Sequence, residues 1–364
     1  MNYKDKILQG HSLEILKTIP DNIIDCCITS PPYWGLRSYS TNFQIWDSEI
    51  NCKHKWGINN IKKLRTKTGK NSIMKSHNES SCLKTIDEGC FCQLCGAWKG
   101  ELGSEPTFDL FINHLTQIFD EIKRVLKSTG TCFVNLGDTY NGTKQGNTET
   151  NKNPKLVTNS FKKEKVKNIP NKCLCMIPER FAIQMIDNGW ILRNKIIWHK
   201  ENQMPSSVTD RFTVDFEDIF FFVKQQKYYF EQQLEPYTEP MNRWGSVKLE
   251  ANGVSIWDKG TKQTTYRNKN MRPNEEGRNM RTVWTINTQP NSEAHFATYP
   301  ELLVEKIIKA GCPENGLCLD PFMGSGTTGL VAKKLNRNYL GIDLNPEYIK
   351  IANNRIFNEI GLFI

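Results

Sequence analysis

Ser30-Pro31-Pro32-Tyr33, which follows the largely apolar run 23–28, is the first stretch that suggests chemistry. The run is typical of a buried strand, and two consecutive prolines end it because neither has an N–H to give to a sheet ladder. Ser30 Oγ and the main-chain oxygens of Ser30 and Pro31 could accept both hydrogens of a planar exocyclic amino group, while the Tyr33 ring offers a stacking surface. The stretch suits the amino group of a nucleobase, and an ordinary Pro-Pro turn after a strand is the alternative.

Residues 318–328 form a second motif, in which a strand ends in Asp320, a glycine-rich turn follows and a helical pattern begins. Backbone N–H groups of such a turn can approach a ligand at a helix N-terminus, as in nucleotide pockets at the carboxyl ends of strands. The turn is not a GxxxxGK[ST] phosphate loop, because no Lys follows Gly326. Gly324, Gly326 and Gly329 do fit GxGxxG, so these residues leave open a dinucleotide or a smaller adenosine cofactor.

The short strand 338–343 ends in a further acid, Asp343, which could hydrogen-bond ribose hydroxyls. The order of the motifs resembles the DNA amino-methyltransferases of the permuted beta group, in which (S/N/D)PP(Y/F) precedes the S-adenosylmethionine motif. The resemblance covers most of the chain and includes Gly-Ile-Asp-Leu-Asn-Pro-Glu-Tyr at 341–348. It also includes His-Phe-Ala-Thr-Tyr-Pro at 295–300, which is similar to the family motif beside the methionine end of the cofactor. A dinucleotide site predicts neither Ser-Pro-Pro-Tyr nor Asp-Pro-Phe.

The resemblance implies an α/β, Rossmann-like methyltransferase fold: a mixed seven-stranded sheet with helices on both faces, a Cys-rich insertion and a target-recognition region. It implies that Asp320 holds the methionine ammonium of S-adenosyl-L-methionine and Asp343 its ribose. The family has an acidic residue where this chain has His11, so a cofactor role and a surface turn are both open for His11. The implied catalytic residues are Ser30, Pro31, Pro32 and Tyr33. The implied cofactor-binding residues are Asp320, Phe322, Gly324, Ser325, Gly326, Thr327, Asp343, Asn345, Phe296, Thr298, His11 and Ser12.

The expected reaction is methyl transfer to an exocyclic amine of a base flipped out of double-stranded DNA. Such an amine shares its lone pair with the ring, so acceptors for its hydrogens must return electron density to nitrogen. In the family, Ser-Pro-Pro-Tyr accompanies N4-cytosine methylation more often than N6-adenine methylation. We therefore expect N4-cytosine, with N6-adenine as the alternative. A non-catalytic zinc-containing DNA-binding protein, and an RNA or protein amide methyltransferase, are further alternatives.

Composition is consistent with this interpretation of the motifs. The chain has 364 residues, 12 cysteines and a formal net charge of +9. A polar N-terminus and the absence of a long apolar run predict a cytoplasmic protein with no membrane partner, in which cysteines are core residues or metal ligands rather than disulfides. Basic segments at 62–75, 144–172 and 259–281 favour a nucleic-acid footprint over solvated loop charge. A cognate restriction endonuclease is an expected partner in the cell.

A cysteine-rich insertion carries the pattern of a zinc site. Cys92-x-x-Cys95-Gly is a knuckle turn that lets two thiolates reach one ion, and Cys52-x-His54 would complete four ligands. Cys82 and Cys90 are alternative ligands, and packing of the cysteines as small hydrophobes is the competing interpretation. A four-coordinate ion would be structural, so we expect its loss to weaken DNA binding and to leave cofactor binding intact.

The chain divides into the following expected parts: catalytic core at 1–50, insertion at 51–98, core at 99–224 with a mobile linker near 141–171, target-recognition region at 225–285, and cofactor-binding core at 286–364. Helical spacing predicts helices at 110–127 and 178–188. Apolar runs predict core strands at 131–137, 192–199 and 219–223.

Overall fold

The computed structural model describes residues 3–35, 43–57, 62–63, 85–86, 90–142, 169–236, 277–288 and 299–361. The following predicted features lie wholly or mostly outside these residues: Phe296, Thr298, Cys82, the basic run 62–75, the linker 141–171 and the target-recognition region 225–285. No helix in the described part of the chain combines the length and the apolar character needed to span a bilayer.

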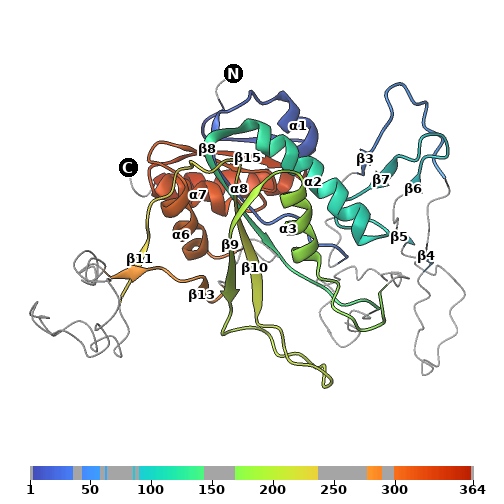
Figure 1. The fold of residues 1–364 in the computed structure, drawn as a ribbon. Coiled ribbons are helices and arrows are strands. Elements are labelled where there is room, and N and C mark those ends of the chain that lie inside the picture. The colour runs from blue at the N-terminus through green and yellow to red at the C-terminus, as the bar shows by residue number, and fades with distance from the viewer. Residues whose placement is uncertain are drawn as a thin grey trace, which may run out of the picture.

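One mixed sheet organises the described chain (Figure 1). Its eight strands, in spatial order, are β1 (Lys6–Gln9), β15 (Asn338–Asp343), β14 (Leu317–Asp320), β2 (Ile24–Thr29), β8 (Leu126–Leu136), β10 (Phe216–Val223), β9 (Ile191–His199) and β13 (Val283–Thr285). The first five pair in parallel, and β10 runs antiparallel to β8 and β9. The fold class is therefore confirmed. The sheet has one strand more than the seven expected, because β13, too short to show a strand pattern, pairs in parallel with the edge of β9.

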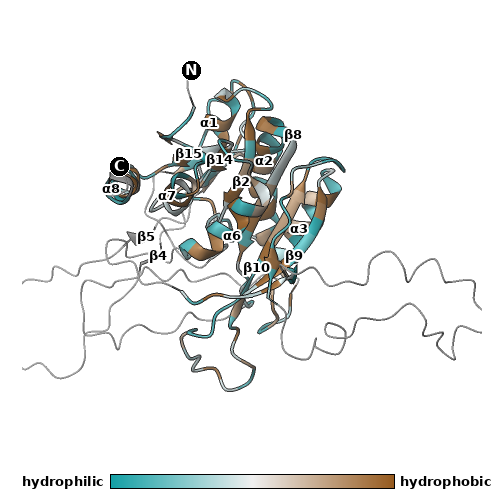
Figure 2. Cartoon of the chain, turned by 90° about the vertical axis from the view of Figure 1, so that its left-hand side faces the viewer, coloured by the Kyte–Doolittle hydropathy of each residue, from teal (hydrophilic) through white to brown (hydrophobic). Residues whose placement is uncertain are grey.

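Helices cover both faces of this sheet, as expected (Figure 2). The alternation of β2 decides which side chains meet which layer: Cys27 packs with one cluster, and Cys26 and Ile28 pack with the other. The first layer contains α1 (Ser12–Thr18), α2 (Phe108–Val125) and α3 (Ile177–Asp187), and the second contains α6 (Glu301–Gly311), α7 (Thr327–Lys334) and α8 (Pro346–Gly361). A buried hydrophobic core therefore lies on each face of the sheet.

The predicted elements are confirmed with shifts of a few residues at their ends. Helix α2 begins two residues before the predicted start, where Thr107 Oγ1 accepts the backbone N–H of Leu110 as a cap. The apolar stripe that gives this helix its spacing, which includes Phe111, Leu115 and Phe119, is fully buried. The chain then passes directly into β8, because Leu126 has extended backbone geometry.

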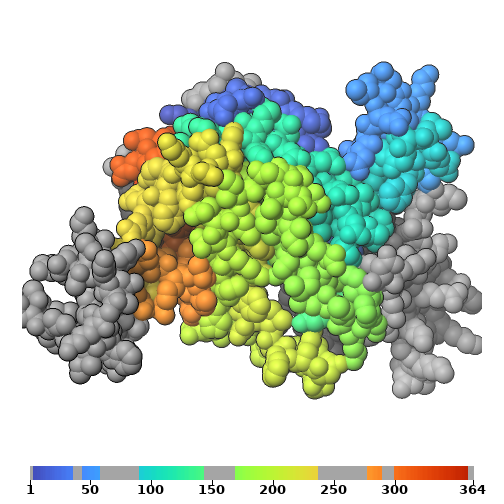
Figure 3. Space-filling view, viewed as in Figure 1, coloured from blue at the N-terminus to red at the C-terminus, as the bar shows by residue number. Residues whose placement is uncertain are grey.

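A small antiparallel sheet lies beside α2. Its order is β3 (Gln44–Trp46), β7 (Trp98–Gly100) and β6 (Cys90–Phe91). In the space-filling view this part, blue and cyan, projects from one side of the molecule (Figure 3). Two further strand pairs are β4 (Lys62–Lys63) with β5 (Thr85–Ile86), and β11 (Leu234–Glu235) with β12 (Arg278–Asn279). The residue ranges given above for the core, the insertion and the target-recognition region stay predictions.

Candidate active site

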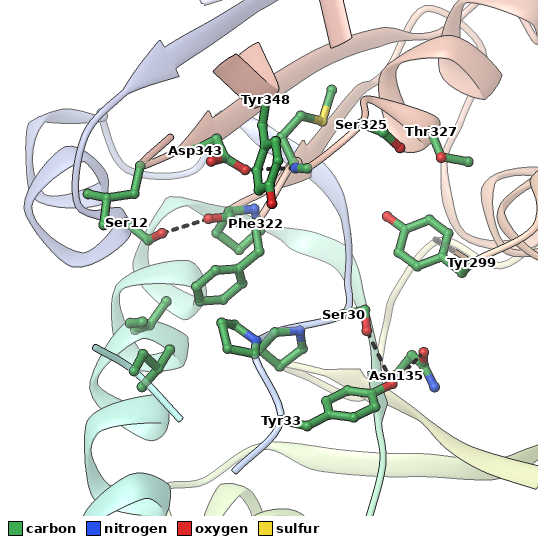
Figure 4. A pocket seen from close by; sticks show the side chains of 18 of the residues that line it. Ser12, Ser30, Tyr33, Asn135, Tyr299, Phe322, Ser325, Thr327, Asp343 and Tyr348 are labelled. Carbon is green, nitrogen blue, oxygen red and sulfur yellow. Dashed lines mark hydrogen bonds between the residues drawn. The ribbon is translucent and has the colours of Figure 1, made fainter. Parts of the chain in front are cut away.

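A cavity of about 360 Å³ opens at the carboxyl ends of three neighbouring parallel strands (Figure 4). Ser30 follows β2, Pro321 follows β14 and Asp343 ends β15, and all three line the cavity. This volume is in the range of sites for small organic ligands. The two motifs found in the sequence thus face one space, since carboxyl ends of parallel strands meet at one edge of the sheet.

The Ser-Pro-Pro-Tyr turn, including Pro31 and Pro32, forms one wall of the cavity. Ser30 Oγ donates to Tyr33 Oη over 3.3 Å. The Tyr33 hydroxyl in turn lies 2.7 Å from Glu217 Oε2 and 3.0 Å from Asn135 Oδ1. Tyr33 is therefore held at its hydroxyl end as well as at its backbone.

Four polar or aromatic residues beside this turn were not identified from the sequence: Asn135, Glu217, Lys200 and Trp198. Lys200 Nζ forms an ion pair with Glu217 Oε1 and lies 4.1 Å from the centre of the Trp198 ring. Asn135 Nδ2 donates to the backbone oxygen of Asp218 over 3.2 Å, which turns its Oδ1 toward Tyr33. A polar residue near the end of an otherwise apolar strand was the one signal that could have marked Asn135 and Glu217.

Asp320 lies beneath the cavity wall and is only 1% exposed. Its Oδ1 accepts from Thr29 Oγ1 at 2.8 Å and from the Phe322 N–H at 3.1 Å. Its Oδ2 accepts from Tyr299 Oη and from Thr328 Oγ1, both at 2.6 Å. Burial raises the pKa of this carboxyl, and the four donors oppose the shift. The expectation that Asp320 meets the methionine ammonium does not fit this placement, because each of its oxygens already accepts two protein hydrogen bonds and the carboxyl is buried below the wall.

Tyr299 is a wall residue that the sequence reasoning did not single out, although it belongs to the quoted motif 295–300. Its hydroxyl bonds Asp320 and Thr328, and burial raises its pKa well above the ordinary value. The ring therefore faces the cavity while its hydroxyl braces the turn below. Phe296 and Thr298, the predicted contacts from this motif, lie outside the described residues.

The glycine-rich turn brings backbone to the cavity. Gly324 has a φ of 51° and Gly326 a φ of 82°, so both occupy the left-handed region that glycine adopts without strain. The Gly324 N–H donates to Asp343 Oδ2 and the Asn345 N–H donates to Asp343 Oδ1, each over 2.8 Å. Burial raises the pKa of Asp343, which these N–H groups oppose. Asp343 thus ties the turn to the end of β15.

Of the predicted cofactor-binding residues in this region, those on the wall are Phe322, Gly324, Ser325, Thr327 and Asp343. Gly326 and Asn345 are not on the wall. Gly326 directly precedes α7, and a Cβ atom added to it would come within 2.8 Å of Ala352. The Asn345 side chain accepts a hydrogen bond from the Glu347 N–H at the start of α8. These two residues shape the turns that carry the wall.

His11 and Ser12 also line the cavity. Ser12 Oγ donates to the Pro321 carbonyl over 2.6 Å. The His11 ring lies edge-on to Trp46 at 4.6 Å, and burial lowers its pKa to about 4, so the imidazole is neutral at pH 7. Among described residues its buried Nε2 has no hydrogen-bond partner. Of the two interpretations left open by the sequence, the structure supports a cavity residue.

The small sheet also reaches the cavity, through Gln44 of β3 and through Glu101 and Leu102, which directly follow β7. It is fixed to α2 by His114, whose ring stacks on Trp46 at 4.6 Å and on Trp98 at 5.4 Å. Because His114 holds the small sheet against α2, the sheet contributes to the cavity wall.

Carboxylates hold both nitrogens of the same histidine. The Nδ1 of His114 lies 2.9 Å from Glu105 Oε1, and its Nε2 lies 3.0 Å from Asp47 Oδ2. The Glu105 carbonyl also accepts the indole N–H of Trp34, the residue after the Ser-Pro-Pro-Tyr turn. Glu105 therefore links His114, which packs on the small sheet, to the segment that follows the Ser-Pro-Pro-Tyr turn.

Cys52, His54, Cys92 and Cys95 lie together, with their four ligand atoms all within 4.8 Å of one another. The Sγ atoms of Cys52 and Cys92 are 3.9 Å apart, and Cys95 Sγ is 3.5 Å from His54 Nδ1. A tetrahedral zinc ion with Zn–S bonds of about 2.3 Å separates two sulfurs by about 3.8 Å, so the donor set fits. His54 Nε2 lies 3.1 Å from Ser48 Oγ, which orients Nδ1 toward the cysteines.

The surroundings of the Cys92 sulfur favour its thiolate form. Burial acts to raise its pKa, but backbone N–H groups of Cys95 and Leu94 and the side chain of His54 outweigh it and lower the pKa to about 6. Cys90, named as an alternative ligand, is buried in β6 and is not in the cluster. The four ligands picked from the sequence are thus the four that the fold assembles.

Comparisons with known proteins agree with the geometry. The family model for DNA methylase, N6_N4_Mtase, matches residues 24–354. The Type II methyltransferase M.Cfr9I of Citrobacter freundii is 31% identical over 97% of this chain and 88% of its own length. M.SmaI of Serratia marcescens is 31% identical over 97% of this chain and 91% of its own.

Solved structures share the fold. The cytosine-N4-specific PvuII DNA methyltransferase aligns with a TM-score of 0.53 at 16% identity, over 98% of this chain and 92% of that one. TTHA0409 of Thermus thermophilus, complexed with S-adenosyl-L-methionine, aligns with a TM-score of 0.51 at 16% identity, over 98% of this chain and 94% of that one. Because the family model spans most of the sequence and relatives above 30% identity cover nearly all of it, the chain belongs to the N6_N4_Mtase family of DNA methylases.

Proposed function

We propose that this protein transfers a methyl group from S-adenosyl-L-methionine to the exocyclic N4 of cytosine in double-stranded DNA. One observation carries the proposal: the Ser-Pro-Pro-Tyr turn and the glycine-rich turn line a single cavity at the edge of the sheet. An amine acceptor site and a nucleoside site are therefore within reach of each other, as a direct group transfer requires.

The described residues fit the adenosyl cofactor. Asp343 offers carboxylate oxygens to the ribose, and the left-handed Gly324 lets the chain come close. The buried, unpartnered Nε2 of His11 lies in the same wall and suits a polar atom of the base. When bound, the cofactor supplies an electrophilic methyl sulfonium. Asp320 is proposed to lie below the wall and to hold the glycine-rich turn in place through its hydrogen bonds.

On the acceptor side, Ser30 and the carbonyls of the proline turn accept hydrogens of the amine and return electron density to nitrogen. The Tyr33 ring holds the base by stacking. The base must leave the duplex to reach this wall, at a cost of a few kcal/mol. The basic segments of the sequence are proposed to hold the DNA backbone, and the region 225–285 to read the sequence.

Ser30 supports cytosine N4 as the target, since this serine motif accompanies N4 methylation more often. The cytosine-N4-specific activity named for the PvuII relative points the same way. The name Type II, shared by the relatives M.Cfr9I and M.SmaI, supports a cognate restriction endonuclease in the cell.

We also propose that Cys52, His54, Cys92 and Cys95 hold one structural Zn²⁺. The fit of their spacing to a tetrahedral ion supports it. Four protein ligands leave no open position, so the ion would order the small sheet and take no part in methyl transfer.

The deciding experiment follows a tritiated methyl group from the cofactor into DNA and identifies the product by mass spectrometry of the nucleosides. N4-methylcytosine is expected. N6-methyladenine would move the assignment to the alternative target. Label in RNA or protein alone would identify a different acceptor, and no transfer at all would make the chain a non-catalytic DNA-binding protein.

A further inference from the structure

The hydrogen bonds around Tyr33 run in one direction, from Ser30 through Tyr33 to Glu217. Glu217 in its ionised form can only accept, so the single proton of the Tyr33 hydroxyl goes to Glu217 Oε2 at 2.7 Å rather than to the neutral Asn135 oxygen at 3.0 Å. Ser30 must then be the donor in its 3.3 Å bond to Tyr33 Oη. What Ser30 presents to an incoming amine is therefore a lone pair.

The series of hydrogen bonds from Ser30 through Tyr33 ends at the Glu217 carboxylate, whose counter-ion is Lys200. Lys200 pairs with Glu217, and their side chains are 10% and 22% exposed. Among described residues, Lys200 and Tyr33 are the titratable groups that contact Glu217. The neighbouring charges are paired elsewhere, Asp218 with Lys195 and Asp215 with His199. Glu217 lines the cavity beside Tyr33, and among described residues its carboxylate accepts hydrogen bonds from Tyr33 and Lys200.

Methylation of an exocyclic amine requires a place for a proton. The nitrogen begins with two hydrogens, gains a methyl group and a positive charge, and must lose one hydrogen to give the neutral product. A serine hydroxyl cannot keep that proton at neutral pH, so the proton has to pass on.

We propose that Ser30, Tyr33 and Glu217 form a proton relay for the methyl transfer proposed above, on which this inference rests. As the N–C bond forms, the C–S bond breaks and its electron pair returns to sulfur. The amine proton moves to Ser30 Oγ, the Ser30 proton to Tyr33 Oη and the Tyr33 proton to Glu217 Oε2. The sulfonium charge and the carboxylate charge both disappear, so atoms and charge balance. In this relay Glu217 acts through Tyr33 and is a positioning residue.

The test uses Glu217→Gln in the full-length protein. The glutamine side chain can still accept a hydrogen bond from Tyr33, but it cannot take up a proton. The single-turnover rate of tritium transfer at saturating cofactor and DNA should fall about 100-fold. Cofactor affinity and DNA affinity should stay at wild-type values, and Glu217→Asp should recover part of the rate.

A double variant separates a relay from simple support of the Tyr33 ring. Tyr33→Phe keeps the ring but breaks the same series of hydrogen bonds. The double variant with Glu217→Gln and Tyr33→Phe should therefore be no slower than the slower single variant. Glu305→Gln is the matched control, because Glu305 pairs with Lys309 on the exposed face of α6.

The outcomes distinguish the relay from the underlying function. Glu217→Gln at the wild-type rate, or single effects that multiply in the double variant, would overturn the relay while Ser30→Ala still impairs transfer. Wild-type protein that moves no label into DNA would overturn the proposed function and the relay with it.

Discussion

Thr29 Oγ1 donates a 2.8 Å hydrogen bond to Asp320 Oδ1, although 291 residues separate the two in the chain. Thr29 ends β2 immediately before the Ser-Pro-Pro-Tyr turn, and Asp320 ends the neighbouring strand β14 before the glycine-rich turn. The bond therefore fixes the two walls of the cavity relative to each other. Both residues are almost fully buried, so water does not compete for the bond.

Thr29→Val should remove this donor with little change in shape. A buried carboxylate that loses a donor costs about 1–3 kcal/mol, so the free energy of unfolding should fall by that amount in urea titrations. Cofactor affinity measured by calorimetry should fall too, because the turn that follows Asp320 loses a support. Thr116→Val in α2 removes a different buried hydroxyl bond and should affect stability alone. An unchanged cofactor affinity in Thr29→Val would contradict the link between the walls.

Ser30→Ala and Ser12→Ala should separate the two halves of the cavity. Ser30 faces the proposed amine site, so its loss should lower the single-turnover rate about 100-fold and spare cofactor affinity. Ser12 bonds the Pro321 carbonyl across the nucleoside side, so its loss should weaken cofactor binding. Calorimetry with S-adenosyl-L-methionine and a tritium-transfer assay measure the two effects. Equal loss of cofactor affinity in both variants would refute the division of roles.

His11 should make the protein sensitive to mild acid. Burial lowers its pKa from 6.5 in the unfolded chain to about 4 in the fold, so between these values the unfolded state binds more protons. Stability from this group is present above pH 6.5 and is lost as the pH falls toward 4. From pH 7 to pH 5 the wild type should lose about 2 kcal/mol more of its free energy of unfolding than His11→Asn.

Denaturant unfolding of both proteins at the two pH values checks this difference. The buried acids with raised pKa values, including Asp320 and Asp343, are present in both proteins and cancel in the comparison. Parallel pH dependence in the two proteins would show that His11 is not desolvated.

Cys95→Ser should reduce bound zinc and also weaken cofactor binding. The sequence alone led us to expect that cofactor binding would not depend on the ion. The structure leads us to expect a dependence instead, because Gln44 of β3 and Glu101, which directly follows β7, line the cavity. A loss of about tenfold in cofactor affinity, about 1.4 kcal/mol, is expected.

Elemental analysis and calorimetry on the same preparations provide the measurement. Cys173→Ser is the matched control, since this exposed cysteine lies outside the metal cluster. Wild-type protein without stoichiometric metal would leave the four residues as packing residues. Metal loss without any change in cofactor affinity would restore the original expectation.

Much of this protein could be predicted from local features of the sequence. The prolines after 23–28, the glycines after Asp320 and the apolar spacing of α2 each depend on a few neighbouring residues, whose geometry covalent structure and periodicity largely determine. The short spacings of Cys52 with His54 and of Cys92 with Cys95 are local features too, and the fold brings these four ligand atoms within 4.8 Å of one another. The meeting of the two motifs at one sheet edge depends instead on the parallel pairing of β2, β14 and β15.

Only the tertiary structure decided the rest of the site. Glu217 lies opposite Trp198 because β10 pairs antiparallel with β9, and Asn135 lies opposite Ile219 because β10 also pairs with β8. A shift of one residue in either register would turn these side chains to the other face of the sheet, and no local pattern sets that register. Burial likewise placed Asp320 below the wall and His11 in it. Such side chains acquire their roles from neighbours distant in the chain, which is why the sequence named the turns but not the network around Tyr33.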